Sequence, residues 1–283
     1  MRLVKCAAAL LIRPARPVFA VLVVCLATAC TTSPTGRSQL MLISPEAAIV
    51  ESKKAYLSTV GELEQNNKLV DDPIVADRVA TITGRLVTEA VALYPQTKNW
   101  EWSVAIIDDD ETVNAWCMAG GRMAAYTGLF EKLQLNDDEF AQIMGHEISH
   151  ALANHTAEQM SRAIAINIGV VAAGVAADSS ALALAGTALA AKFALELPNS
   201  RVAESEADRI GIELATRAGY DPRAAASLWE KMGALPGDRP PEFMSTHPAP
   251  ENRQAALIEL VPEMRALNPT QQLSAVSPVD IAR

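Results

Sequence analysis

Apolar residues recur every three to four positions along much of this 283-residue chain, which is the period of helices that bury one face. Ser44 and Pro45 predict one helix start, because a capping hydroxyl precedes a proline at the first helical position. Asp72 and Pro73 predict a second helix, which reaches about Leu93. The pattern therefore favours a mostly helical chain.

One region follows a different period. Across residues 100–107 apolar side chains fall on alternate positions, which predicts a strand. Two further short strands are expected at 113–118 and 122–126, because the Gly120-Gly121 pair between them allows a tight connection. We therefore expect an α+β fold that is mostly helical and contains a small antiparallel sheet.

The segment from Asn136 to His155 predicts another helix. Asn136 is a good N-cap, and Glu139 three residues later completes a capping box. We expect this helix to continue to about Arg162, with His155 on a different face from the motif below and in a structural role. The apolar positions share one helical face: Phe140, Ile143, Met144, Ile148, Ala151 and Leu152.

The same segment carries the pattern His-Glu-x-x-His at His146, Glu147 and His150. Residues four apart share a helical face, so both imidazoles can bind one metal ion while Glu147 takes a proton from a water on that ion. A catalytic zinc usually has three protein ligands. Glu204 and Asp208 also lie four apart, so one acid can bind the metal while the other holds the second ring nitrogen of a ligand histidine.

The charge of the chain excludes one class of partner. The chain has 33 acidic and 24 basic residues, a formal net charge of −9, and its basic residues form no stripe. A nucleic-acid partner is therefore not expected.

The N-terminus is typical of an export signal. Residues 1–29 combine a basic start with an apolar run at 18–29, which is too short to span a membrane. Small residues before Cys30 predict lipidation of that cysteine, although Ala27-Thr28-Ala29 also fits ordinary signal-peptidase cleavage. Thr31, by resemblance to Gram-negative lipoproteins, indicates the outer membrane. We expect a periplasmic protein anchored by lipid in the inner leaflet of the outer membrane, or alternatively a soluble periplasmic protein.

The rest of the chain divides by composition. Residues 30–38 are polar and predict a short tether, and residues 39–262 are expected to form one domain. Within that domain, 163–197 is strongly apolar and predicts a buried helical hairpin insertion, with a hydrophobic lid or a membrane-contacting hairpin as alternatives. Residues 263–283 are expected to be a loosely ordered tail.

Several ordered motifs resemble the HtpX and CAAX-prenyl-protease type of zinc metallopeptidases, a gluzincin family. They are most similar to its periplasmic lipoprotein and quality-control branch. The resemblance implies a zincin-like domain, in which the small sheet lies next to the His-Glu-x-x-His helix, and one zinc ion per chain. The matching motifs are Val113-Asn114-Ala115-Trp116, His146-Glu147-x-x-His150, Glu204-x-x-x-Asp208-Arg209 and Thr246-His247-Pro248.

The resemblance also assigns roles to single residues. It implies that Glu204 is the third zinc ligand, although spacing alone leaves Glu206 as an alternative. It implies that His247 faces the metal, either as a fourth ligand in a resting state or as a catalytic group that stabilises the oxyanion; a plain loop histidine is the alternative. Asp208 is expected behind the ligands, and Arg253 either supports the site or is a surface arginine.

These observations together predict a zinc-dependent endopeptidase. Asn114, Ala115 and Trp116 lie on a strand that can pair with an extended substrate, and main-chain pairing tolerates many sequences. The expected substrates are unfolded or misassembled proteins of the cell envelope. The alternative is a chaperone-like binding module with a zinc site closed by His247 and little proteolysis. The sequence gives no oligomeric state.

Overall fold

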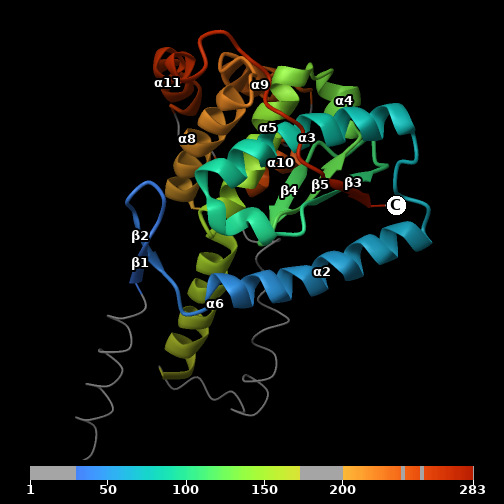
Figure 1. Cartoon of the computed structure of the whole chain (residues 1–283). Coiled ribbons are helices and arrows are strands. Elements are labelled where there is room, and N and C mark those ends of the chain that lie inside the picture. The colour runs from blue at the N-terminus through green and yellow to red at the C-terminus, as the bar shows by residue number, and fades with distance from the viewer. Residues whose placement is uncertain (1–29, 173–199, 237–239, 249–251, 283) are drawn as a thin grey trace, which may run out of the picture.

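The computed structural model describes residues 30–172, 200–236, 240–248 and 252–282 (Figure 1). A four-stranded sheet with the order β4-β5-β3-β6 lies at the centre of this part of the chain. β4 and β5 pair antiparallel, as the Gly120-Gly121 connection predicts, whereas β3 runs parallel to both β5 and β6. The sheet is therefore mixed. Its strands are β3 (Ser103–Ile107), β4 (Ala115–Met118), β5 (Arg122–Tyr126) and β6 (Asp280–Ala282).

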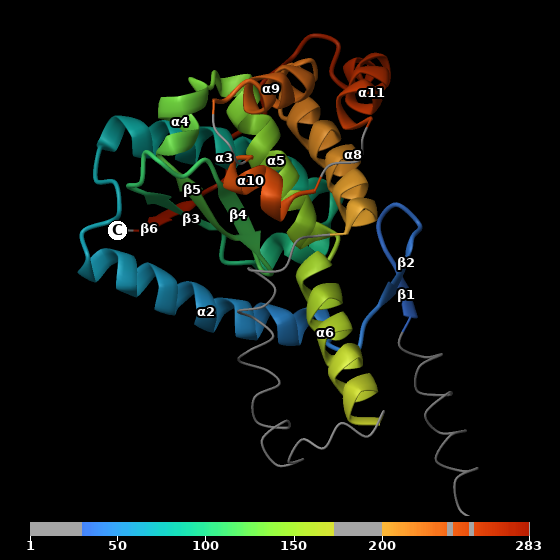
Figure 2. The same ribbon diagram turned by 180° about the vertical axis from the view of Figure 1, so that it is seen from behind.

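Helices cover both faces of the sheet (Figures 1 and 2). α2 (Pro45–Gln65) lies on one face, and α3 (Pro73–Leu93) and α5 (Asp137–Leu152) lie on the other. Successive side chains of β3 enter different clusters: Val104 packs on the α3 and α5 side, and Ala105 packs with residues of α2. Two-sided burial explains why β3 is apolar at nearly every position. The mostly helical α+β fold is confirmed.

The helix starts follow their capping residues. The side chain of Ser44 accepts from the N–H of Ala47, and that of Asp72 accepts from the N–H of Ile74. At the start of α5, Asn136 and Glu139 form the complete capping box. Local sequence chemistry therefore fixes where these three helices begin.

The prediction of one continuous helix from Asn136 to Arg162 is wrong. α5 ends at Leu152, and a new helix, α6 (His155–Ala172), begins three residues later. Asn154 between them has a φ of +56°, a left-handed conformation that asparagine adopts more readily than most residues. Residues 173–199 lie outside the described residues, and with them most of the apolar hairpin expected at 163–197.

The segment expected to be a tether is folded. β1 (Cys30–Thr32) and β2 (Ser38–Leu40) pair antiparallel across a turn that contains Gly36 at a φ of +89°. This hairpin lies beside α6 and the start of α8 (Arg201–Arg217) in both views (Figures 1 and 2). The prediction missed it because the contacts that hold it are made with side chains far along the chain.

The tail is also ordered, contrary to the prediction for residues 263–283. α11 (Arg253–Leu267) continues through Pro262, where a domain boundary was expected. Beyond it, the N–H of Ser277 donates to the carbonyl of Gly84, and β6 pairs with β3. The partners of the tail lie near the start of the domain, so its local composition does not reveal that it pairs.

The remaining elements complete the layer around α5, and the important one is α8 (Arg201–Arg217). α5 and α8 touch through their backbones, because a Cβ atom built on Gly211 would lie 2.8 Å from the backbone nitrogen of His146. One built on Gly145 would lie 2.9 Å from the carbonyl oxygen of Gly211. Glycine at both positions therefore allows α8 to approach the metal-motif helix. The other elements are η1 (Pro95–Asn99), α4 (Gly128–Leu133), α9 (Ala224–Gly233) and α10 (Glu242–Thr246).

Within the described ranges, no helix is both long enough and apolar enough to cross a membrane.

Candidate metal centre

α5 presents both motif histidines on the side that faces α8. The Nε2 atoms of His146 and His150 lie 3.0 Å apart, as expected for residues four apart on a helix. Glu147 is buried next to them. Because α5 is covered on all sides from Glu139 to Leu152, these polar side chains lie inside the protein.

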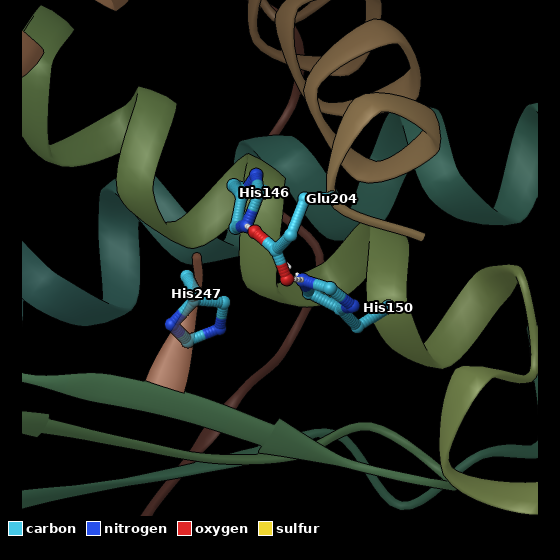
Figure 3. Close-up of side chains that lie close together, drawn as sticks. All are labelled: His146, His150, Glu204 and His247. Carbon is cyan, nitrogen blue, oxygen red and sulfur yellow. Dashed lines mark hydrogen bonds and ion pairs between the residues drawn. The ribbon is translucent and has the colours of Figure 1, made fainter. Parts of the chain in front are cut away.

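Two more residues converge on these histidines from distant parts of the chain (Figure 3). Glu204, in the first turn of α8, places its Oε2 atom 3.3 Å from Nε2 of His146 and its Oε1 atom 3.5 Å from Nε2 of His150. His247 follows α10 and lies toward the sheet. One potential ligand atom from each of the four residues lies within 4.8 Å of the others.

The cluster has the properties of a metal site. Glu204 is fully buried, and neither of its carboxylate oxygens accepts a hydrogen bond; Nη2 of Arg253 lies 3.3 Å from Oε2 of Glu204, but this guanidinium also pairs with Asp208 at 2.5 Å. An ionised carboxylate in such a place is costly unless a cation compensates it. Imidazole nitrogens with one carboxylate oxygen are the donors that catalytic zinc sites use. The residues present therefore fit a metal ion.

The electrostatics of the cluster also favour a cation. Burial lowers the pKa of His146, but the carboxylates of Asp208 and Glu204 outweigh it and raise this pKa to about 9. Burial raises the pKa of Glu147 to about 8, and the nearby charge of Glu204 adds to the effect. The shift of His146 reports nearby negative charge, whereas that of Glu147 comes mainly from burial, and a bound cation would lower both pKa values.

Asp208 and Arg253 lie directly behind His146. The Oδ1 atom of Asp208 lies 3.1 Å from Nδ1 of His146, and Nη2 of Arg253 donates to the same oxygen at 2.5 Å. The guanidinium of Arg253 lies 3.7 Å from the ring centre of Trp229 and is buried, so the surface-arginine alternative is wrong. Asp208 thus orients the ring of His146, and Arg253 holds Asp208 in turn.

His247 belongs to the cluster and is not a plain loop histidine. Its Nδ1 atom lies 3.0 Å from the carbonyl oxygen of Phe243, so Nδ1–H donates there and leaves Nε2 toward the cluster. Nε2 lies 3.3 Å from Oε1 of Glu147. Burial lowers the pKa of His247 to about 4, which favours a neutral ring whose unprotonated Nε2 can bind a metal; donation from Nε2 to an oxyanion would require a second proton on the ring.

The predicted substrate strand is β4, which forms one edge of the four-stranded sheet in the described part of the chain. The carbonyl of Val113, just before β4, accepts from the N–H of Phe243. From there on, the outer edge of β4 faces the cluster, and the N–H of Cys117 donates to the carboxylate of Glu147. Not all three predicted residues face the cluster. The side chain of Asn114 donates to Glu242 at 3.1 Å, and Trp116 packs edge-on against Tyr56 on the opposite face.

Sequence reasoning missed the role of His155. Because α6 begins after a break in the helix, the imidazole of His155 turns back toward α5. The Nδ1 atom of His155 lies 2.8 Å from Nδ1 of His150. Its Nε2 atom lies 3.1 Å from Oε2 of Glu206. The spacing of His155 from the motif and the turn-forming Asn154 before it are the only local signals of this contact.

Glu206, the alternative third ligand, faces away from the four-residue cluster. Its carboxylate accepts from Thr35 at 2.6 Å and from Arg37 at 2.9 Å, in addition to the contact with His155. Burial would raise the pKa of Glu206, but hydrogen bonds from His155, Ser33, Thr35 and Arg37 outweigh it and hold the pKa well below its usual range. The carboxylate of Glu206 is therefore charged and fully partnered without a metal.

The mixed sheet, the His-Glu-x-x-His helix against it and the buried glutamate contributed by a following helix define a zincin-like metallopeptidase. A family model, Peptidase family M48, matches residues 73–261, which is more than half of the chain. The chain belongs to peptidase family M48.

Known relatives include mitochondrial and bacterial proteins. The mitochondrial metalloendopeptidase OMA1 of Arabidopsis thaliana is 35% identical over 67% of this chain and 38% of its own length. The OMA1 of Bos taurus is 29% identical over 83% of this chain and 46% of its own length. The beta-barrel assembly-enhancing protease of Escherichia coli K12 is 30% identical over 74% of this chain and 43% of its own length. The chain thus spans less than half the length of these relatives.

Proposed function

We propose that this chain is a zinc-dependent endopeptidase that hydrolyses peptide bonds at the buried cluster. The observation that carries the proposal is the convergence of His146, His150 and Glu204 around a carboxylate with no hydrogen-bond partner. Membership in peptidase family M48 supports the same activity. His146, His150 and Glu204 are the proposed ligands, and His247 is either a fourth ligand or an oxyanion donor.

The chemistry divides between the ion and the chain. When bound, zinc lowers the pKa of a coordinated water and polarises the substrate carbonyl. Glu147 accepts a proton at its carboxylate and later passes it to the leaving amine. The N–H of Cys117 orients this carboxylate from the strand edge, so an extended substrate would pair with the other main-chain groups on that edge of β4.

We propose that the substrates are unfolded or misassembled proteins of the cell envelope. The name of the relative from Escherichia coli, beta-barrel assembly-enhancing protease, supports an envelope role. The export signal in residues 1–29 and the small residues before Cys30 support a lipid-anchored periplasmic protein at the outer membrane. Metabolic labelling of the full chain with a lipid precursor tests the anchor, because Cys30→Ala should abolish the label.

A second candidate function is a chaperone-like module with little proteolysis. The position of His247 favours it, because a ring nitrogen that faces the cluster can fill the coordination position that substrate requires. Casein cleavage by wild type and by His247→Ala separates the two. Faster cleavage by the variant supports the closed site, whereas a loss of cleavage assigns His247 to the reaction.

The variant Glu147→Gln tests the peptidase proposal directly. It should keep bound zinc and lose casein cleavage by about 10²–10⁴-fold, because only the proton transfer is removed. Glu213→Gln makes the same change on α8, where Glu213 pairs with Arg217 away from the cluster, and should cleave normally. Full activity in Glu147→Gln would refute the proposed role of this carboxylate.

A further inference from the structure

The zinc mechanism leaves one buried polar network without a task. It runs from His150 through His155 and Glu206 to Arg37, and each contact in it is 3.1 Å or shorter. His155 and Glu206 are both buried. Burying several polar groups together is costly, so we expect this network to orient the group at its inner end. That group is His150, a proposed zinc ligand.

The hydrogen-bond roles along this network follow from the two ends. Nε2 of His150 faces the cluster, so a neutral His150 that binds metal through Nε2 carries its proton on Nδ1. That proton must be accepted by Nδ1 of His155, which lies 2.8 Å away. His155 then carries its own proton on Nε2 and donates it to the carboxylate of Glu206. The charged Glu206 therefore selects one tautomer for both rings.

The N-terminal hairpin holds the outer end of this network. Arg37 donates to Oε2 of Glu206 at 2.9 Å and to both oxygens of Glu158 on α6, at 2.8 and 2.6 Å. Thr35 donates to Oε1 of Glu206 at 2.6 Å. Hairpin, α6 and α8 are thus joined at the point where the carboxylate of Glu206 faces His155.

We propose that His155 and Glu206 are positioning residues that fix the ring and tautomer of His150 for zinc binding, and that the hairpin β1–β2 holds Glu206 in place. This inference rests on the proposed zinc site. Asp208 orients His146 by direct contact, whereas the carboxylate of Glu206 acts on His150 through a second histidine, His155. Groups behind a metal ligand typically contribute 10–100-fold to metal affinity.

Zinc affinity of the full metal-free chain, measured by competition with a chromophoric chelator, tests the inference. His155→Phe removes the acceptor for His150 and should weaken binding about 10–100-fold. His155→Asn places an amide oxygen where Nδ1 lies and should recover most of that loss. Both variants lose the contact with Glu206, so their thermal stabilities should fall alike. A difference in zinc affinity between them therefore isolates the acceptor.

Glu206→Gln probes the next step. Glu206 accepts from its donors with two oxygens, whereas glutamine offers only one acceptor oxygen. Zinc binding should therefore weaken about tenfold. Glu213→Gln is the matched control, because it makes the same change on α8 at a carboxylate that accepts from Arg217 and lies outside this network. It should bind zinc as wild type does. The visible spectrum of the cobalt-loaded protein should change for His155→Phe and stay unchanged for Glu213→Gln.

The outcomes separate the two proposals. Wild type that binds no zinc would refute the proposed function itself. Wild type that binds zinc, with His155→Phe and Glu206→Gln binding equally tightly, would refute the positioning role alone. Should His155→Phe not fold, an unchanged affinity in Glu206→Gln still overturns the inference, and a selective loss in Glu206→Gln relative to Glu213→Gln still supports it.

Discussion

Glu204 and Glu206 lie two residues apart on α8 and are both buried, yet their surroundings are opposite. Neither oxygen of Glu204 accepts a hydrogen bond, and three imidazoles lie around it. Glu206 accepts from a threonine, an arginine and a histidine. The same acid thus faces a place that needs a cation on one side of the helix and a place already neutralised on the other.

This contrast shows how a chain can separate residues that bind a metal from residues that hold those ligands in position. A buried carboxylate without donors is costly, so a bound cation stabilises its site. A buried carboxylate with donors is stable alone and can hold another group in position. Helix geometry makes the separation possible, because residues two apart on a helix point to different sides.

The largest expected effect comes from removing Glu204, the carboxylate without hydrogen-bond donors. Glu204→Ala should weaken zinc binding by well over the roughly 100-fold that an outer residue contributes, because a ligand atom is lost. Casein cleavage should disappear with the metal. Metal content of the purified protein, measured by atomic emission beside Glu206→Gln, checks the contrast. Equal zinc in Glu204→Ala and wild type would mean that the unpartnered carboxylate is not a ligand.

The next effect comes from forcing the two helices apart. Gly211→Ala would place a methyl group 2.8 Å from the backbone nitrogen of His146, and backbone atoms cannot move aside cheaply. We expect a loss of about 1–3 kcal/mol in the free energy of unfolding, together with weaker zinc binding, because Glu204 moves away from both histidines. Chemical denaturation measures the first quantity. Gly61→Ala, where an added Cβ has no neighbour within 4 Å, is the control and should not destabilise the protein.

The third effect, which becomes the smallest at acid pH, concerns the hairpin side. Burial would raise the pKa of Glu158, but hydrogen bonds from Arg37 and Gln39 and the charge of Arg162 lower it below its usual value. A carboxyl group with a lowered folded pKa stabilises the fold above its unfolded pKa of about 4.3, and this contribution is lost as the pH falls through the folded value. Glu158→Gln should therefore cost about 1–3 kcal/mol at pH 7 and progressively less below pH ~4.

Unfolding curves of wild type and Glu158→Gln across that pH range measure this change. The exposed Glu259 on α11 provides a comparison, because Glu259→Gln should alter stability little at any pH. A deficit in Glu158→Gln that stays constant down to the acid limit would show that packing, and not the charge on Glu158, holds the hairpin.

Several parts of the molecule depend only on local spacing and can be predicted from the chain alone. Capping residues such as Ser44, Asp72 and Asn136 mark helix starts, because a side chain and the backbone donor it satisfies lie within a few residues. The spacing of His146 and His150 places both rings on one face for the same reason. The motifs after them then supplied Glu204, Asp208 and His247 through a family resemblance.

The other features depend on tertiary contacts, which join residues that no local rule connects. The choice between Glu204 and Glu206 depends on how α8 lies on α5, and that is set by the backbone contact at Gly145 and Gly211. The role of His155 depends on a helix break and on a partner 51 residues away. Pairing of the tail with β3 and docking of the hairpin on α8 depend on partners even farther along the chain, so neither composition nor periodicity encodes them.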